Sequence, residues 1–386
     1  MKTRRILALV LALTMVFALF GCGNNTPSTT AAPTTTKAPE TKAPESQAPG
    51  TTADAKAAVD EFLAKGLEKP LTWSVATGTG TGKQYVFMSS IGGVVNEKIN
   101  NLTWNMESSN GGVDNVNQMK EGTFDMGFVQ QDTAYEAVNG VGDFDEAYPD
   151  LRAVFPCYTQ QFFIATTSEK LGNNEIKDIH EMDGMVCGTG KVTGSVWISV
   201  LKLQEVFDMS KIEFRELTTG DTFSQMAEGR VDMSMGVQGQ PNTNITEYAT
   251  NAANPPLYHP WLSDALIDQI LEKYPFYSKD VIAKETYKSL TADYPTYGCW
   301  AFVFCDKKQD DLACYLICKA LFENTQDLAV TLDSFKTLKP EQITNCVLPL
   351  KTGAIWFYEE QGVQIPKELY PEEYISLEDY VASLGK

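Results

Sequence analysis

Short apolar runs alternate with helical patterns of hydrophobic and polar positions along most of this chain. Such alternation is typical of an α/β fold whose strands are largely parallel. The pattern predicts strands at residues 71–76, 102–107, 126–129, 185–187, 212–216 and 233–237.

Two segments of the pattern occur twice. Met-Lys-Glu-Gly-Thr-Phe-Asp-Met at residues 119–126 is matched by Met-Ala-Glu-Gly-Arg-Val-Asp-Met at residues 226–233, an offset of 107 (226 − 119). Gly-Thr-Gly at residues 78–80 recurs at residues 188–190, an offset of 110 (188 − 78), each time after a predicted strand. The same order at nearly the same offset indicates an internal duplication.

The two repeats predict different roles. The first is a helix ending at Gly, a tight turn and a strand opened by Asp, so Asp125 and Asp232 are expected to bond free amides of the turn rather than a ligand. The second is a strand, a Gly-rich loop and a helix, which leaves unpaired N–H groups at the positive end of the helix dipole. One such loop from each half would place two helix starts across a cleft, a geometry that suits a small anion or zwitterion.

The N-terminus predicts export. Basic residues at positions 2, 4 and 5 precede an apolar run at residues 6–20, which is short for a membrane span. Leu-Phe-Gly-Cys at residues 19–22 resembles the lipobox of bacterial lipoproteins, although Phe20 replaces a small residue, and an uncleaved anchor is the alternative. We therefore expect a lipoprotein signal peptide at 1–21, lipid attachment at Cys22 and a protein anchored to the outer face of the bacterial cytoplasmic membrane, either periplasmic or at the cell surface.

The segment 22–53 is rich in Thr, Pro and Ala, a composition that predicts a disordered stalk. The remaining 333 residues (386 − 53) are too many for one ordinary core and predict two lobes. From the duplication we expect the first lobe at 54–157 plus 295–386 and the second at 158–294. The formal net charge of −19, near −22 once a +3 signal is removed (−19 − 3), disfavours nucleic-acid partners.

The titratable residues give little sign of catalysis. Seven cysteines remain beyond Cys22, an odd number in apolar runs, and are expected to be buried free thiols. Cys314 and Cys318 share a helix face without a nearby His, so no metal is expected. The two histidines, His180 and His259, have no triad or metal spacing and are expected at the surface or in loops.

Nucleotide-binding motifs are also incomplete. Around Gly82 and Lys83, Thr77 and Gln84 stand where a phosphate-binding loop needs Gly and Ser or Thr. Lys83 also occupies the third Gly position of a dinucleotide fingerprint. We therefore expect neither an enzyme nor a bound cofactor.

A series of motifs in sequence order carries a family resemblance. The series comprises residues 77–85, Thr-Gly-Thr-Gly-Thr-Gly-Lys-Gln-Tyr; 107–115, Glu-Ser-Ser-Asn-Gly-Gly-Val-Asp-Asn; 122–125, Gly-Thr-Phe-Asp; 129–132, Val-Gln-Gln-Asp; 188–195, Gly-Thr-Gly-Lys-Val-Thr-Gly-Ser; 239–241, Gly-Gln-Pro; 282–287, Ile-Ala-Lys-Glu-Thr-Tyr; and 349–354, Pro-Leu-Lys-Thr-Gly-Ala. Over about residues 71–358 the chain resembles the TAXI solute-binding proteins of TRAP (tripartite ATP-independent periplasmic) transporters.

The resemblance implies a two-lobed, periplasmic-binding-protein-like fold of type II, with a hinge and a ligand cleft between the lobes. It also implies delivery of a small organic acid or amino acid, similar to glutamate or 2-oxoglutarate, to a membrane permease. The chain departs from the family pattern at Asn110, Gly112, Lys191 and Lys351, which bears on the identity of the solute.

The expected ligand-binding residues combine both arguments. Backbone N–H groups and hydroxyls would receive a carboxylate, while amide side chains would orient it. The expected set is Gly80, Gly82, Tyr85, Ser109, Asn115, Gln130, Thr193, Gly194 and Ser195, to which the Gly-x-Pro motif of the family adds Gly239 and Pro241.

Some assignments stay open. Tyr85 could cover the ligand or fill a helix–sheet interface, and Asn115 could cap or pack a helix. Asp132 is expected to cap the following helix rather than to accept a ligand ammonium, and Lys351 is expected to lie at the surface. Three other functions remain: a ligand-binding module for a sensor kinase, a subunit of an ABC importer, or a secreted enzyme on a two-lobed scaffold, which the scarcity of histidines disfavours.

Overall fold

We analysed a computed structural model, which describes residues 53–78, 83–190 and 194–384. The expected signal peptide, the lipid attachment site Cys22 and the stalk up to residue 52 lie outside the described residues, as do Gly80, Gly82 and Thr193. Within the described ranges, no helix has the length and apolar character needed to cross a membrane.

One mixed sheet runs through the folded part of the chain. Among the described residues it has nine strands, eight of them in the order β2-β1-β3-β11-β4-β8-β6-β7, with β10 paired to β11. The strands are β1 (Leu71–Ala76), β2 (Leu102–Glu107), β3 (Met126–Gln130), β4 (Leu151–Thr166), β6 (Val186–Gly188), β7 (Glu213–Arg215), β8 (Met233–Gln238), β10 (Tyr277–Ile282) and β11 (Tyr294–Asp306). A small separate sheet pairs β5 (Glu175–Ile176) with β9 (Trp261–Leu262) in parallel.

The predicted duplication is confirmed by the strand pairing. β1 pairs in parallel with β2 and β3, and β6 pairs in parallel with β7 and β8. The prediction of largely parallel strands holds only within these two triplets. β4, β10 and β11 pair antiparallel, because two long strands join the triplets into one sheet.

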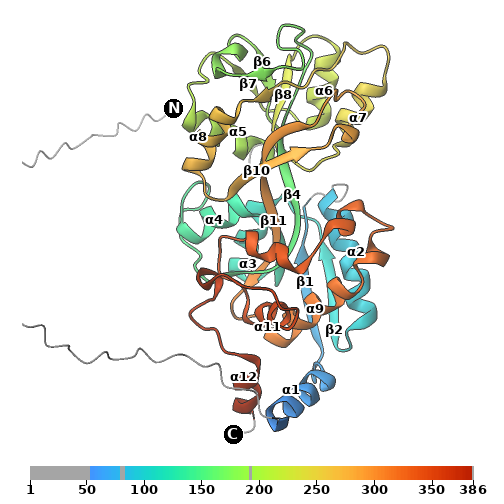
Figure 1. Cartoon of the computed structure of the whole chain (residues 1–386), viewed down its shortest axis with the longest axis vertical. Helices are drawn as coiled ribbons and strands as arrows, with labels where there is room; N and C mark the ends of the chain where they lie inside the picture. Colours follow the sequence, from blue (N-terminus) through green and yellow to red (C-terminus); the bar gives the residue numbers. More distant parts are fainter. Residues whose placement is uncertain (1–52, 79–82, 191–193, 385–386) are drawn as a thin grey trace, which may run out of the picture. The chain divides into compact units, whose positions relative to one another are not determined.

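The helices and buried cores divide the described chain into two lobes (Figure 1). The largest apolar cluster draws on residues 67–158 and 301–369 with Ile198 added, and we call this part the first lobe. Two smaller clusters draw on residues 162–299 and 163–294 and form the second lobe. The two-lobed α/β class predicted from sequence is therefore confirmed.

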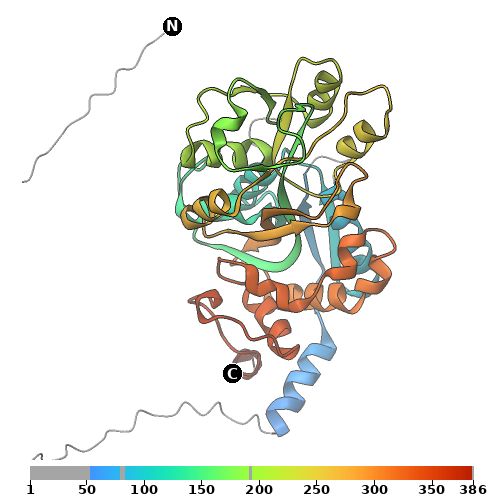
Figure 2. The ribbon, with the colours of Figure 1, turned by 45° about the horizontal axis from the view of Figure 1, so that its top comes forward.

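The first lobe carries helices at both ends of the sequence. They are α1 (Ala53–Lys65), α2 (Lys83–Lys98), α3 (Gly112–Glu121), α4 (Gln131–Asn139), α9 (Asp311–Glu323), α10 (Thr325–Leu328), α11 (Thr352–Glu360) and α12 (Leu377–Leu384), with 3-10 turns η3 (Asp333–Thr337), η4 (Pro340–Asn345) and η5 (Lys367–Leu369). In Figure 2, α1 extends from the end of the first lobe that faces away from the second. It packs there on α12, with the rings of Phe62 and Tyr380 5.7 Å apart.

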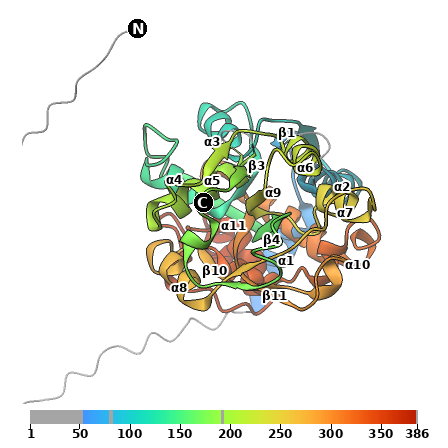
Figure 3. The ribbon, with the colours of Figure 1, turned by 90° about the horizontal axis from the view of Figure 1, so that it is seen from above.

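The second lobe has shorter helices around its strand triplet. They are α5 (Ser195–Val206), α6 (Thr219–Ala227), α7 (Thr243–Thr250) and α8 (Asp264–Lys273), with 3-10 turns η1 (Ile179–Met182) and η2 (Lys284–Thr286). Figure 3 shows α7 and α8 toward opposite sides of this lobe. The expected lobe boundary at residue 157/158 falls inside β4, and the one at 294/295 falls at the start of β11.

The repeated Gly and Asp positions have matching structural roles. Gly122 and Gly229 adopt left-handed conformations, with φ of 80° and 69°, as the predicted turn requires. The Asp125 carboxylate accepts a hydrogen bond from Ser74 N at 2.9 Å, and Asp232 accepts one from Val186 N at 2.7 Å. Both carboxylates thus join neighbouring strands. The expectation that they bond the amides of their own turns is therefore wrong.

Several expectations about single residues can now be compared with the structure. All seven cysteines in the described residues are buried and free, as predicted. His259 lies in a loop, which is one of the two places expected for it, but it is 1% exposed and does not reach the surface. Lys351 is also buried, because its ammonium pairs with Asp311 Oδ1 at 2.6 Å and donates to the Lys307 carbonyl.

Candidate functional site

A cavity of about 180 Å³ lies where the two lobes meet. We call it the helix-start cavity, because the beginnings of α2, α3, α4 and α5 contribute to it. Its lining residues are Thr77, Gly78, Gln84, Asn110, Gly111, Gly112, Phe128, Gln130, Thr133, Gln160, Gly194, Ser195 and Ile198. The interlobe cleft predicted from sequence is therefore present, with α5 as the contribution of the second lobe.

Three of these helices begin without a side-chain cap. The N-cap residues are Gly111 for α3, Gln130 for α4 and Gly194 for α5, and none makes a side-chain capping hydrogen bond. By contrast, Thr218, Asn242 and Asp310 cap α6, α7 and α9 with their side chains. The uncapped starts direct backbone N–H groups and the positive ends of helix dipoles at one place, which favours a bound anion.

The described lining is polar and carries no titratable side chain. Gln130 Nε2 donates to Gln160 Oε1 at 2.7 Å, so these two amides from β3 and β4 hold each other in place. Hydroxyls of Thr133 and Ser195 add neutral donors and acceptors. Such a cavity can receive a carboxylate through hydrogen bonds from neutral groups rather than through an ion pair.

Asn115 has a structural role beside the cavity. It is fully buried, and its Nδ2 donates to the carbonyls of Thr77 at 2.9 Å and Phe128 at 2.7 Å. These bonds join the ends of β1 and β3. Its Oδ1 has no hydrogen-bond partner among the described residues, which leaves one buried acceptor for a neighbouring group.

The structure brings together only part of the expected site. Gln130, Gly194 and Ser195 line the helix-start cavity. Ser109 lies next to its lining segment and accepts a hydrogen bond from Gly111 N at 3.3 Å. Tyr85 lines neither this cavity nor the second one described below. The expected ligand-binding roles of these five residues remain predictions.

Gly239 and Pro241 belong to a different place. Pro241 lines a second cavity of about 360 Å³, which we call the Lys83 cavity, and Gly239 lies against the Lys83 and Tyr158 side chains. The lining of the Lys83 cavity is Lys83, Cys157, Tyr158, Thr159, Gln161, Gln240, Pro241, Val281, Ile282, Ala283, Thr286, Trp300, Ser334, Thr337, Leu338 and Gln342.

Sequence reasoning missed several lining residues. Gln160 stands with Gln161 in a long, mainly apolar strand, and this pair of adjacent amides is the signal that could have identified it. Gln84 was considered only as a departure from a phosphate-binding loop. Thr133 gave no signal, because a Thr in the first turn of a helix is common in any fold.

An ion pair near the cavity also joins the lobes. Glu136 of α4 bonds Lys202 of α5, and both side chains are largely buried. Lys202 further lies over the rings of Tyr274 and Phe276, 5.9 and 5.6 Å from their centroids. Burial raises the pKa of Glu136, an effect that the nearby Lys202 partly offsets. The pair therefore holds α4 of the first lobe against α5 and the loop before β10.

The fold and the cavity define a two-lobed α/β protein with a polar cavity between its lobes. The chain belongs to the NMT1-like family, whose model matches residues 75–362. Membership of the TAXI family is more specific than membership of the NMT1-like family, and it stays a prediction.

Solved structures with similar folds are distant in sequence. The alkanesulfonate-binding protein SsuA from Xanthomonas axonopodis pv. citri, bound to MOPS, is 11% identical with a TM-score of 0.41, over 76% of this chain and 92% of that one. An ABC transporter periplasmic substrate-binding protein from Coxiella burnetii is 11% identical with a TM-score of 0.39, over 68% and 96%. The BvgS periplasmic domain of B. pertussis is 11% identical with a TM-score of 0.40, over 74% and 45%. Likenesses this weak carry no argument about the ligand.

Proposed function

We propose that this protein is the extracytoplasmic solute-binding subunit of a TRAP-type secondary transporter. It captures a small carboxylate-bearing solute between its lobes and delivers it to the membrane permease. The observation that carries the proposal is the convergence of three uncapped helix starts from both lobes on one neutral, polar cavity. Cys22 would carry the lipid that tethers the protein to the outer face of the membrane.

The lining favours an organic acid over an amino acid. A carboxylate would bond the N–H groups at the starts of α3 and α5, and Gln130 would orient it. An ammonium would need an acidic partner, and the described lining residues include none. The nearest candidate from the sequence, Asp132, is buried and already accepts hydrogen bonds from Thr133 and Tyr277.

A thermal-shift screen of small organic acids, amino acids and sugars tests this proposal. A solute at a hundred times its dissociation constant stabilises a protein by about 2.7 kcal/mol. We expect a specific rise with one class of carboxylate, weakened at least tenfold in affinity by Gln130→Leu, since a charge-assisted bond contributes about 1.5–3 kcal/mol. Gln364→Leu, at an exposed position, is the matched control.

Two results would reject the proposal. One is a panel without any stabilising carboxylate, and the other is a carboxylate whose binding Gln130→Leu leaves unchanged. The alternative partners, a sensor kinase or an ABC importer, require the same solute binding. The genes encoded beside this one distinguish them, because each system needs its own membrane subunits.

A further inference from the structure

The Lys83 cavity and the helix-start cavity share no lining residue, although both draw on β4 and on the first turn of α2. Successive side chains of a strand point to opposite faces. Accordingly, Gln160 lines the helix-start cavity, while its neighbours Thr159 and Gln161 line the Lys83 cavity. The first turn of α2 separates the two cavities in the same way, with Lys83 in one and Gln84 in the other.

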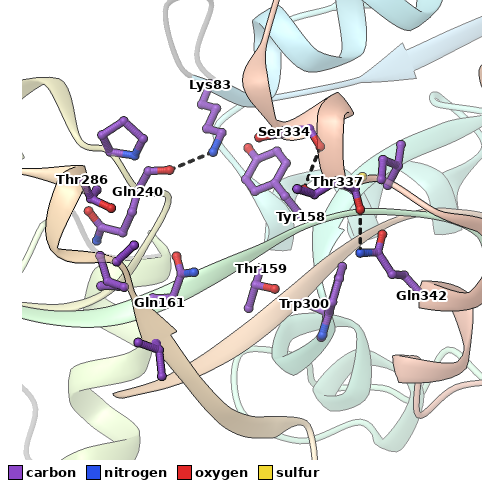
Figure 4. A pocket seen from close by; sticks show the side chains of 16 residues that line it. Lys83, Tyr158, Thr159, Gln161, Gln240, Thr286, Trp300, Ser334, Thr337 and Gln342 are labelled. Atoms are coloured by element: carbon purple, nitrogen blue, oxygen red, sulfur yellow. Dashed lines mark hydrogen bonds between the residues drawn. The ribbon is translucent and has the colours of Figure 1, made fainter. Parts of the chain in front are cut away.

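Lys83 brings a positive charge to this cavity without an acidic partner. Its Nζ donates to the Gln240 carbonyl at 3.0 Å and lies 4.3 Å from the centroid of the Tyr158 ring (Figure 4). It forms no ion pair with any residue in the described part of the chain. Desolvation lowers the pKa of Lys83 to about 8, and the charge of Asp333 acts in the opposite direction.

Lys83 is half-buried, and the two buried lysines of the described chain are neutralised. Lys202 pairs with Glu136, and Lys351 pairs with Asp311 at 2.6 Å. A desolvated ammonium costs free energy unless an anion compensates it. Lys83 differs from the other two because the space in front of it is a cavity rather than a carboxylate.

The rest of the lining can hold an organic molecule. The hydroxyls of Thr159, Thr286 and Ser334 make no hydrogen bonds with described residues and are available as donors. Figure 4 shows Lys83 reaching toward Gln240, with Thr159 and Gln161 on the strand below them. Apolar side chains of Ile282, Trp300 and Leu338 complete the wall, which a purely inorganic anion would leave unused.

We propose that the Lys83 cavity is a second binding site, which takes a small organic carboxylate with the Lys83 ammonium as its counter-ion. The site is separate from the helix-start cavity and goes beyond the proposed transport role. The occupant would contact both lobes, since Lys83 belongs to α2 of the first lobe and Gln240 follows β8 of the second. The volume of the Lys83 cavity, about 360 Å³, lies within the range of small-ligand cavities.

The test uses 4-bromobenzoate as the probe and neutral 4-bromobenzamide as its control. Calorimetry on the full chain is expected to detect binding of the carboxylate and not of the amide. Lys83→Met should weaken the affinity at least tenfold, because the counter-ion is lost. Lys98→Met, on the same helix but exposed and paired with Glu97, should bind like the unchanged protein.

Anomalous diffraction from bromine locates the probe without relying on any variant. A bromine peak in the Lys83 cavity that persists in Gln130→Leu supports the inference. A peak only in the helix-start cavity overturns it and leaves the proposed transport function standing. Absence of binding, or equal binding by Lys83→Met, also overturns it.

Discussion

His259 is a buried titratable residue that has a polar partner at each ring nitrogen. Its Nδ1 faces the Ile164 carbonyl at 3.3 Å, its Nε2 faces Ser289 Oγ at 2.7 Å, and its ring stacks on Phe163. Desolvation lowers the pKa of His259 from 6.5 to about 4. The folded protein therefore holds a neutral imidazole that the unfolded chain protonates more readily.

This difference predicts acid sensitivity. Between pH 6.5 and 4 the unfolded state binds the proton and the folded state does not, so stability is lost as the pH falls. The loss from His259 should approach roughly 3 kcal/mol at pH 4. Urea unfolding at pH 7 and pH 4.5 measures it. His259→Gln should flatten the dependence, while His180→Gln at an exposed site should not.

Single residues also mark where sequence reasoning ends. The motifs of the family resemblance identified Gln130 and Ser195 as candidates, since these residues lie in the segments 129–132 and 188–195. They could not identify the orphaned Oδ1 of Asn115, since that depends on where the carbonyls of Thr77 and Phe128 lie. The burial of His259 and Lys351 was not predicted either, because each is buried by partners distant in the chain.

At the scale of elements, the two repeated strand-to-loop connections differ in how closely they are packed. A Cβ added at Gly188, the end of β6, would lie 2.3–2.8 Å from the side chain of Thr222. Thr222 is buried and its hydroxyl donates to the Thr218 carbonyl, so it has little room to move. Among the described residues, a Cβ at the equivalent Gly78 would meet Gln84 alone, at 4.0 Å.

Substitution by alanine should therefore separate the two connections. Gly188→Ala is expected to lower the free energy of unfolding by about 1–3 kcal/mol through overpacking. Gly78→Ala should change it by less than about 0.5 kcal/mol. Chemical denaturation of both variants is the measurement, and equal losses would contradict the packing described for β6 and α6.

The pairing of α4 with α5 leads to another element-scale prediction. Glu136→Gln leaves the Lys202 ammonium buried without a counter-charge, so it should destabilise the protein by roughly 3 kcal/mol. The exposed pair of Glu61 and Lys65 on α1 is the matched control, and Glu61→Gln should leave the stability nearly unchanged because water screens this pair. Thermal unfolding of the two variants measures the loss of stability in each. Similar losses would mean that the Lys202 ammonium reaches water.

At the scale of the whole molecule, the α/β class, the duplication and the two lobes could be predicted from the sequence. They follow from hydrophobic periodicity, repeated segments and chain length, which do not depend on how distant residues pair. The positions of β4 and β11 were not predicted. Both are long apolar strands, and their pairing joins residues more than a hundred positions apart, for example Phe304 with Ala153. No local pattern distinguishes such a shared strand from one that belongs to a single lobe.

The shared strands also favour a specific motion. β4 and β11 are the strands that both lobes share, and the other contacts between the lobes are side-chain bonds such as Glu136 with Lys202 and Lys83 with Gln240. We therefore expect ligand binding to close the lobes as two rigid bodies. Small-angle scattering of the protein with and without a stabilising carboxylate measures this. A radius of gyration that stays constant at saturation would rule out closure.

The place of β11 between β3 and β4 has a consequence for biosynthesis. β3 is made early, and its partner β11 begins only at residue 294. Until that point has left the ribosome, the first lobe exists as three strands with an open edge, whereas the triplet of the second lobe is already complete. The newly made chain must therefore carry an unfinished sheet edge from the completion of β3 until β11 has been made. Protection of that edge, by delayed folding or by a chaperone, is a demand that this topology places on the cell.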